Sequence, residues 1–392
     1  MEEKIRTLVL EANGFGWRPI LVDTFARGIL GIRDITHLPK WLQGNPLAKR
    51  ALKFHYEELS YTIDWREAIC DSPSLETTVC NINDLTSYSK WMKAIKGFEL
   101  IVILHSAAGD DMTILLRTAK WFLERKGKLV VFIGNEYDLM DEKIKFLNKS
   151  QADYVCSQLP INSAKWLYSD CANTQVLEMP HALNSNLYHP DKEERRNIDL
   201  GFRGMPYPLF IGDGERQSLL EYFDAYRESL NLSIDIRYKK LGRVEWAHFL
   251  QTCRGVIGAE AGTHFLDRKG RMISSAKKYV RKHSKATLVE IQNLFKNNPE
   301  QYVSGKAISS RHFEPIGTKT CQVLLEGEYN GILKPGLHYI SIKKDFSNVM
   351  EAIDLFKNVD YRKRIVEQAY ELVMKSHTYR HRMETLIDII TA

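Results

Sequence analysis

The sequence lacks any long hydrophobic run, which excludes a helix that spans a membrane. No window approaches the roughly 18 apolar residues that such a helix needs. The apolar run near the N-terminus holds only Leu8, Val9 and Leu10 before Glu11. A secretion signal needs a longer apolar run. We therefore expect the protein to be made and kept in the cytoplasm.

The sequence also lacks paired cysteines and metal-ligand spacing. Its six cysteines are scattered and form no CxxC motif. This pattern predicts reduced thiols in or near the core rather than a disulfide framework or a zinc site. The formal net charge of +6 is modest. It suits an anionic partner, whether a nucleotide, a lipid diphosphate or a membrane surface, without selecting one, and we expect no nucleic-acid partner.

The length and composition of the chain predict two domains. At 392 residues the chain exceeds what one hydrophobic core usually supports. Hydrophobic residues make up 44% and charged residues 27% of the sequence, which is ordinary for a globular protein. We expect two compact domains of roughly 180 to 200 residues each.

The first half alternates short β-branched runs with amphipathic stretches, the pattern of a parallel sheet with crossover helices. The run FELIVILHS gives an unbroken apolar strand, and the helical pattern MTILLRTAKWFLERKG follows it. The expected strands are residues 7–10, 99–104, 128–133, 153–157 and 175–179.

A segment rich in Pro, Asn and charged residues, PHALNSNLYHPDKEERRN, then interrupts this pattern. Its composition predicts a linker between the domains. A second βα series follows, with helices in ERQSLLEYFDAYRESL and around residues 246–252. Its expected strands are residues 198–202, 233–236, 255–258, 320–325 and 338–342. We predict an N-terminal domain of residues 1–180, a linker of 181–197, a C-terminal domain of 198–375, and a helix of 376–392 that packs back across the junction.

Polar residues that directly follow parallel strands are the first candidates for a site, because ligands bind beyond the carboxyl ends of such strands. His105 follows one strand and could act as a general base, or could simply bond to a neighbouring loop. Glu136 in GNEYD could hold or deprotonate an acceptor hydroxyl. Asn135 and Asp138 beside it could merely cap the next helix.

Two later segments meet the same criterion. In GAEAGTHFLDRKG, the backbone at Gly262 and Thr263 could approach a phosphate, while Glu260 and His264 could contact a sugar or an acceptor. In RHFEPIGTKT, Arg311 offers a bidentate donor for phosphate oxygens. Glu314, three residues later, could accept from the vicinal hydroxyls of a ribose, although a surface Arg–Glu ion pair explains both residues nearly as well.

Two further features lie in the C-terminal half. Gly317 and Thr318 lie where a helix must turn sharply into a strand. Residues 268–285, RKGRMISSAKKYVRKHSK, hold eight Lys or Arg and no acid. Such a run is usually a solvated helix face, and the alternative is contact with a membrane surface or an anionic acceptor.

From about His181 onward, the chain resembles bacterial glycosyltransferases of the family 1 and family 4 kind, especially the CgeB-like group. The resemblance rests on RHFEPIGTKTCQVLLEGEYNGILKPGLHYISIKKD, on HTYRHR, on GFRG and on MPHALN. It covers about the C-terminal 200 residues, whereas the N-terminal half is similar in layout only. It implies a GT-B fold of two Rossmann-like domains with a cleft between them, and usually neither metal nor other cofactor.

The resemblance also implies roles for particular residues. Glu314 would hold the donor ribose, and Arg311 would neutralise the diphosphate. Amides near Gly317 and Thr318 would lie close to the nucleotide. Arg203 and Gly204 would face the phosphates, where positive groups stabilise the leaving nucleotide.

One departure from the family bears on the stereochemistry. Retaining family 4 members carry a glutamate eight positions before the ribose glutamate, and Lys306 stands there in this sequence. We therefore lean towards inversion, with His105, Glu136 or Glu260 as the base. The function expected is metal-independent sugar transfer from a nucleotide-sugar donor to a glycan or lipid-linked glycan in surface polysaccharide synthesis. The alternatives are a nucleotide-sugar epimerase and a non-catalytic glycan-binding or spore-coat protein.

Overall fold

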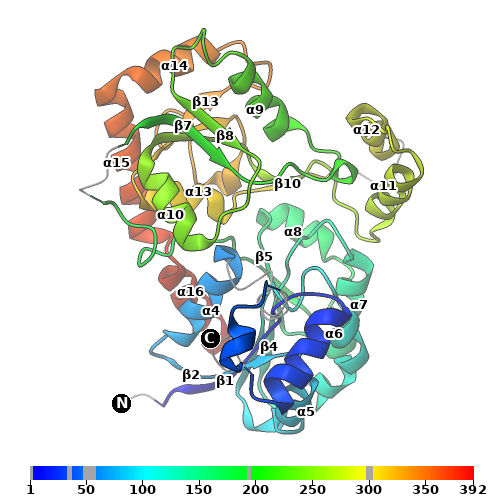
Figure 1. Cartoon of the computed structure of the whole chain (residues 1–392). Coiled ribbons are helices and arrows are strands. Elements are labelled where there is room, and N and C mark those ends of the chain that lie inside the picture. Colours follow the sequence, from blue (N-terminus) through cyan, green and yellow to red (C-terminus); the bar gives the residue numbers. More distant parts are fainter. Residues whose placement is uncertain (1–2, 33–37, 47–58, 192–195, 297–302) are drawn as a thin grey trace.

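A computed structural model describes residues 3–32, 38–46, 59–191, 196–296 and 303–392. The chain forms an N-terminal lobe and a C-terminal lobe, each built on a parallel sheet, with the last helix returning to the N-terminal lobe (Figure 1). None of the described helices is long and apolar enough to cross a membrane. All six cysteines are unbonded, and five of them are buried.

The N-terminal lobe contains a six-stranded parallel sheet in the order β2-β1-β3-β4-β5-β6. Its strands are β1 (Ile5–Glu11), β2 (Leu75–Asn81), β3 (Leu100–Ile103), β4 (Lys128–Phe132), β5 (Tyr154–Ser157) and β6 (Gln175–Glu178). Its helical segments are α1 (Trp17–Leu21), η1 (Val22–Ile29), α2 (Lys40–Gln43), α4 (Ser60–Cys70), α5 (Leu85–Lys93), η3 (Ile95–Gly97), α6 (Thr113–Thr118), η4 (Ala119–Glu124), α7 (Met140–Ser150) and α8 (Ile161–Leu167).

The C-terminal lobe contains a five-stranded parallel sheet in the order β13-β12-β9-β7-β8. Its strands are β7 (Ile198–Arg203), β8 (Ile234–Arg237), β9 (Cys253–Gly258), β12 (Cys321–Leu325) and β13 (Ile340–Ile342). Its helical segments are η5 (Leu209–Ile211), α9 (Glu215–Ala225), α10 (Arg243–Thr252), α13 (Ser310–Gly317), η6 (Tyr329–Gly331), α14 (Val349–Lys357) and α15 (Val359–Ser376).

A small helical subdomain projects at one side of the molecule, on the right in Figure 1, and is formed by the chain between β10 (Ala261–Thr263) and β11 (Gly305–Ala307). It contains α11 (Arg271–Lys282) and α12 (Leu288–Lys296). Its own apolar centre comprises Ile273, Ala276, Ile291 and Phe295. The basic run predicted from the sequence lies mostly on α11.

The expected strands of both halves are present, which confirms the predicted α/β class with two doubly wound sheets. Strands β2, β10 and β11 were not predicted. The expected helix over residues 112–127 is divided, because α6 tightens into the 3₁₀ segment η4 after Thr118. The predicted helix of residues 376–392 is present as the last helix of the chain, and Thr378 caps its N-terminus.

The last helix, α16 (Tyr379–Thr391), contributes its apolar face to the N-terminal lobe. Tyr379, Met383 and Leu386 pack in the same core as Val9 and Trp65. The chain therefore crosses between the lobes twice, once before β7 and once after α15 (Figure 1).

Candidate functional site

A cleft of about 550 Å³ lies between the lobes, where the carboxyl ends of the two sheets meet. Each strand order reverses once, between β1 and β3 and between β7 and β9, and such switch points are where open α/β sheets bind ligands. Residues that follow β3, β4, β7 and β9 line the cleft, together with the start of α13. With residues of β7 and α10, the lining includes His105, Asp110, Asn135, Arg203, Gly204, Arg216, Trp246, Ser309, Arg311 and Glu314.

The first turn of α13 faces this cleft, and a reciprocal cap fixes it. The backbone N–H of Ser309 donates to His312 Nδ1 at 3.0 Å, and His312 Nε2 lies 3.1 Å from the carbonyl oxygen of Ala259. Burial lowers the pKa of His312 to about 4, so the imidazole is neutral at pH 7. The neutral ring holds the helix terminus, whose positive dipole end suits an anionic ligand.

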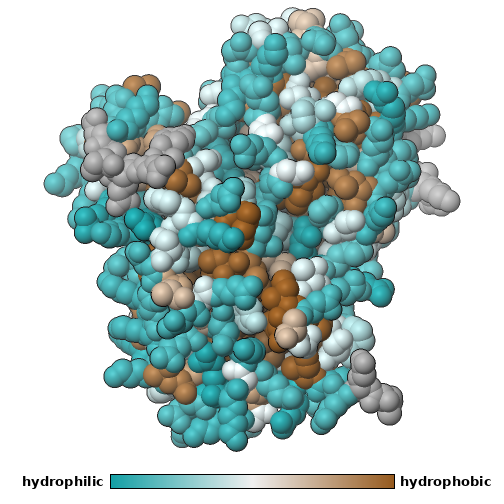
Figure 2. Space-filling model, turned by 180° about the vertical axis from the view of Figure 1, so that it is seen from behind, coloured by the Kyte–Doolittle hydropathy of each residue, from teal (hydrophilic) through white to brown (hydrophobic). Residues whose placement is uncertain are grey.

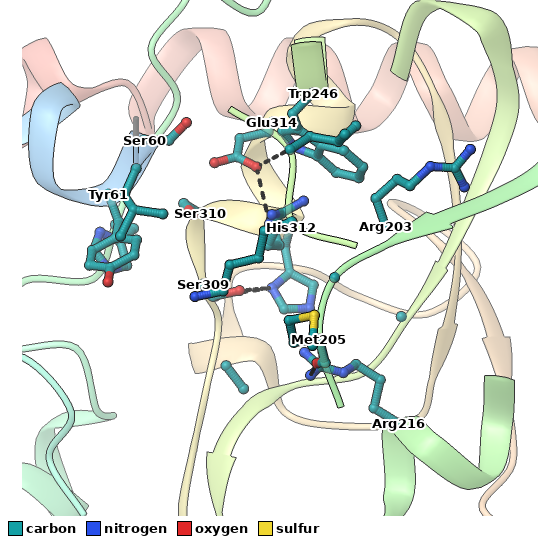
Figure 3. A pocket seen from close by; sticks show the side chains of 18 of the residues that line it. Ser60, Tyr61, Arg203, Met205, Arg216, Trp246, Ser309, Ser310, His312 and Glu314 are labelled. Atoms are coloured by element: carbon teal, nitrogen blue, oxygen red, sulfur yellow. Dashed lines mark hydrogen bonds and ion pairs between the residues drawn. The ribbon is translucent and has the colours of Figure 1, made fainter. Parts of the chain in front are cut away.

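Glu314 lies one turn further along α13, and its carboxylate is buried at the cleft wall (Figure 3). It accepts a hydrogen bond from Trp246 Nε1 at 2.6 Å. Burial raises the pKa of Glu314, and the charge on Arg311 opposes that shift. The indole and the guanidinium thus hold a carboxylate that burial would otherwise penalise.

Arg311 stacks on the same tryptophan, with its guanidinium carbon 4.2 Å from the ring centroid of Trp246. Its Nε lies 4.0 Å from Glu314 Oε2. Its Nη1 is buried and has no hydrogen-bond partner among the described residues. The stacked guanidinium therefore offers donor capacity to a bound ligand.

Two further cleft residues have buried polar atoms without a partner in the described part of the chain. The atoms concerned are the two ring nitrogens of His105 and the side-chain amide nitrogen and oxygen of Gln322. Unpaired buried polar atoms are rare in native proteins. Their gathering around one cleft indicates that it receives a polar ligand.

His105 lies among aromatic rings at the N-terminal wall of the cleft. Its ring centroid is 5.2 Å from that of His181 and 5.3 Å from that of Phe132. Burial lowers the pKa of His105 well below its usual value, and His181 adds to that effect. At neutral pH the imidazole is therefore uncharged and supplies no positive charge.

Arg203 and Arg216 both line the cleft, although only Arg203 was predicted from the sequence. The guanidinium of Arg203 bonds to Asp235, with Nη2 2.6 Å from Oδ2, and points away from Glu314 (Figure 3). Arg216, which the sequence reasoning missed, lines the cleft near the start of α9 and stacks 3.9 Å over Tyr207. Its position in the first turn of the helix after β7 was the sequence feature that could have indicated it.

Two of the three candidate bases lie outside the main cleft. The buried carboxylate of Glu136 accepts from Ser157 Oγ at 2.6 Å and from Tyr168 Oη at 2.7 Å. It borders a smaller cavity of about 150 Å³. Glu260 accepts from the backbone N–H of Tyr329 at 2.7 Å. Both carboxylates hold local structure, whereas His105 faces the cleft.

The other predicted donor contacts are also placed elsewhere. Gly262 has a φ of +97°, and a Cβ there would lie 2.1 Å from the carbonyl oxygen of Gly305, so this glycine permits the β10–β11 pairing. Thr263 is buried and bonds to the Ile211 carbonyl. Gly317 and Thr318 lie at the end of α13 remote from the first turn that lines the cleft.

His264 lies in a charged cluster with Asp213 and Glu215. Within the described part of the chain, the side-chain nitrogen and oxygen atoms of these three residues are close enough together to hold a metal ion. Lys306 Nζ lies 2.7 Å from Asp213 and 3.1 Å from Glu215, and Lys344 Nζ lies 2.6 Å from Glu215. Two ammonium groups thus already neutralise the two carboxylates. A cation would have to displace them, so this cluster fits a metal poorly.

Comparisons with known proteins agree with the architecture. Residues 228–388, less than half of the chain, match a family described as glycosyl transferase-like. No curated protein matches the sequence. Sucrose-phosphate synthase from Thermosynechococcus elongatus is 9% identical over 98% of both chains, with a TM-score of 0.51.

Two other solved structures are similar over nearly the whole chain. HepE from Anabaena, in complex with UDP-glucose, is 9% identical over 99% of both chains, with a TM-score of 0.48. A glycosyltransferase from Rickettsia africae ESF-5 is 10% identical over 99% of this chain and 98% of its own, with a TM-score of 0.48. The likeness to sucrose-phosphate synthase, together with the two parallel sheets, establishes the GT-B architecture of two Rossmann-like domains with a cleft between them.

Proposed function

We propose that the chain is a glycosyltransferase that binds a nucleotide-sugar donor against the C-terminal wall of the cleft and an acceptor against the N-terminal wall. The observation that carries the proposal is the convergence of unpaired buried polar atoms from His105, Arg311 and Gln322 on one cleft of about 550 Å³. The glycosyl transferase-like match over residues 228–388 supports it, since that stretch includes α10, β12 and α13.

The proposed reaction needs no metal. As the bond between sugar and diphosphate breaks, negative charge grows on the leaving nucleotide, and a fixed positive group must stabilise it. Arg311 and Arg216 both line the cleft beside the start of α13 and α9. Their guanidinium groups, with the helix N-termini, are the groups we assign to that role.

We further propose inversion at the sugar carbon, with His105 as the base that takes the proton from the acceptor hydroxyl. It is the one of the three candidate bases that lines the cleft. The acceptor proposed is a glycan or lipid-linked glycan of a surface polysaccharide. That part of the proposal rests on the resemblance of the C-terminal half to bacterial enzymes of such pathways.

A thermal-shift screen with UDP, GDP, dTDP, CMP and their sugar conjugates tests donor binding, because a ligand that binds only the native state raises the melting temperature. The variant is Arg311→Ala, and the matched control is Arg254→Ala, whose side chain pairs with Asp199 and does not line the cleft. One nucleotide should stabilise wild type and control but not Arg311→Ala. The absence of any shift in wild type, or an undiminished shift in Arg311→Ala, would overturn the proposed site.

A further inference from the structure

The smaller cavity of about 150 Å³ lies beside the main cleft, and we call it the side chamber. It shares four lining residues with the cleft, namely Asn135, Gln158, Tyr207 and Ala261. Because these residues border both spaces, the side chamber is a branch of the cleft rather than an isolated void. A ligand that lies in the cleft can therefore extend a substituent into it.

Both lobes contribute walls to the side chamber. The loops after β4 and β5 form one side, and the segment after β7 forms another with the β10–β11 pair. Leu266 after β10 and Ala307 in β11 pack in the same core cluster as Val131 and Ile133 of the N-terminal lobe. Seen from behind, apolar side chains also gather in a band near the middle of the molecule (Figure 2). The side chamber thus lies where apolar residues of the two lobes meet.

The interior of the side chamber is apolar. Its lining includes the buried side chains of Leu159, Ile211, Leu266, Ala307 and Ile308. The described lining includes no Lys, Arg or His, and its one carboxylate is that of Glu136, which already accepts from Ser157 and Tyr168. A phosphate or a carboxylate would lie there without a cation, and burying such a charge unpaired is costly. The walls therefore suit a neutral group with an apolar end.

Gln158 supplies a polar group where the side chamber joins the cleft. Its backbone N–H donates to Glu136 Oε2 at 2.9 Å, and its carbonyl accepts from Asn330 Nδ2 at 3.1 Å. These two bonds fix the main chain. The partly buried side-chain amide makes no hydrogen bond to another described residue. It thus keeps an oxygen acceptor and two N–H donors for a ligand.

We propose that the side chamber binds the acetamido group of an N-acetylated amino sugar. The N–H and the carbonyl of that group pair with the side-chain oxygen and nitrogen of Gln158, and its methyl lies among the apolar side chains. A dry cavity of similar volume is large enough for benzene, which is bigger than an acetamido group. The inference rests on the proposed function and deepens it by naming the class of sugar.

A sugar without the acetamido group should bind more weakly. A hydroxyl at the same carbon is too short to fill the side chamber, and it leaves the apolar walls without a partner. The acetamido sugar gains two hydrogen bonds and the burial of a methyl group. Together these contacts should favour it by at least about tenfold in affinity.

NMR with the methyl glycosides of N-acetylglucosamine and N-acetylgalactosamine tests the inference, with methyl glucoside and methyl galactoside as references. The acetamido methyl protons should receive the strongest saturation from the protein, and titration should give the tenfold preference. Gln158→Leu should lose most of that preference. The matched control is Gln175→Leu, because Gln175 is exposed and lines neither cavity. It should bind both kinds of sugar as wild type does.

Ala261→Val is a second variant, which does not depend on the folding of Gln158→Leu. Ala261 is a partly exposed strand residue that lines both spaces, so the added methyl groups narrow the entrance of the side chamber. This variant should also bind the acetamido glycosides more weakly. Melting temperatures equal to that of wild type confirm that each variant is folded.

The donor sugar and the acceptor sugar are two sources of the same group, and competition separates them. Displacement of the bound glycoside by UDP-N-acetylglucosamine, but not by UDP-glucose, assigns the side chamber to the donor sugar. A glycoside that stays bound with both conjugates present assigns it to the acceptor.

Two results would overturn the inference. One is a wild-type protein that binds the acetamido glycosides no better than the references, and the other is a preference that survives in both Gln158→Leu and Ala261→Val. If a nucleotide still raises the melting temperature of wild type, the inference alone fails and the glycosyltransferase proposal stands. If no nucleotide does so either, both fail.

Discussion

Arg243 on α10 and Glu67 on α4 join the two lobes through a paired contact, with Nη1 2.6 Å from Oε1 and Nη2 2.7 Å from Oε2. The same guanidinium lies 2.8 Å from the buried Asp64. Asn184 bridges the two carboxylates by donating to both. Because Arg243 also lines the cleft, this contact couples the position of the lobes to the shape of the cleft.

Replacing Arg243 by alanine should loosen the junction. Asp64 would remain buried without its cation, and leaving one partner of a buried pair costs about 3 kcal/mol. We expect a lower urea midpoint and a larger radius of gyration by small-angle X-ray scattering. Arg254→Ala removes an arginine that pairs within the C-terminal lobe and should change neither. An unchanged midpoint and radius in Arg243→Ala would show that other contacts hold the lobes.

Replacing Glu314 by glutamine should separate stability from donor binding. Burial raises the pKa of Glu314, so the ionised carboxylate is held at a cost and the neutral amide should be tolerated with little change in melting temperature. If the carboxylate holds the donor ribose, nucleotide affinity should fall at least about tenfold, near the loss expected for a charge-assisted hydrogen bond. Isothermal titration calorimetry measures this, and unchanged affinity would exclude the ribose role.

The candidate bases should respond differently to removal of their acid–base group. His105→Gln should lower kcat by about a hundredfold or more while donor affinity is kept, as for loss of a general base. Glu136→Gln should instead lower the melting temperature, because its carboxylate accepts from Ser157, Tyr168 and the backbone of Gln158. Turnover by the folded fraction should persist. A kcat loss in Glu136→Gln with full activity in His105→Gln would reverse the assignment.

The strands of the fold were predictable where they are buried on both faces. The run at β3 is fully buried, and an unbroken apolar run is what a central parallel strand requires. Strand β2 was missed because five of the seven residues of LETTVCN are only partly buried or exposed, and only Leu75 and Cys80 are buried. Its sequence therefore carries no continuous apolar pattern.

The site was predictable only in part, because sequence position does not fix side-chain direction. Placement after a strand or at the start of a helix correctly brings His105, Arg311 and Glu314 to the cleft wall. The same reasoning could not foresee that Arg203 turns to Asp235.

Acid should destabilise the protein through His312 and His181, which burial holds neutral. Burial lowers the pKa of His312 to about 4 and that of His181 to about 3, whereas an unfolded histidine titrates near 6.5. Between these values the unfolded chain binds more protons, so stability is full above about pH 6.5 and is lost as the pH falls towards 4. Each histidine contributes a slope of about 1.4 kcal/mol per pH unit in that window.

Ionisation of Asp64 changes the folding stability in the opposite direction over nearly the same pH range. Burial raises its pKa to about 7, against the charge of Arg243, so its ionisation costs stability as the pH rises from about 4 towards 7. The difference between wild type and His312→Gln therefore isolates the histidine, since Asp64 and His181 are common to both. Urea unfolding at intervals from pH 4 to pH 7 should give a flatter pH dependence for His312→Gln. Two parallel curves would mean that His312 is not held neutral in the folded state.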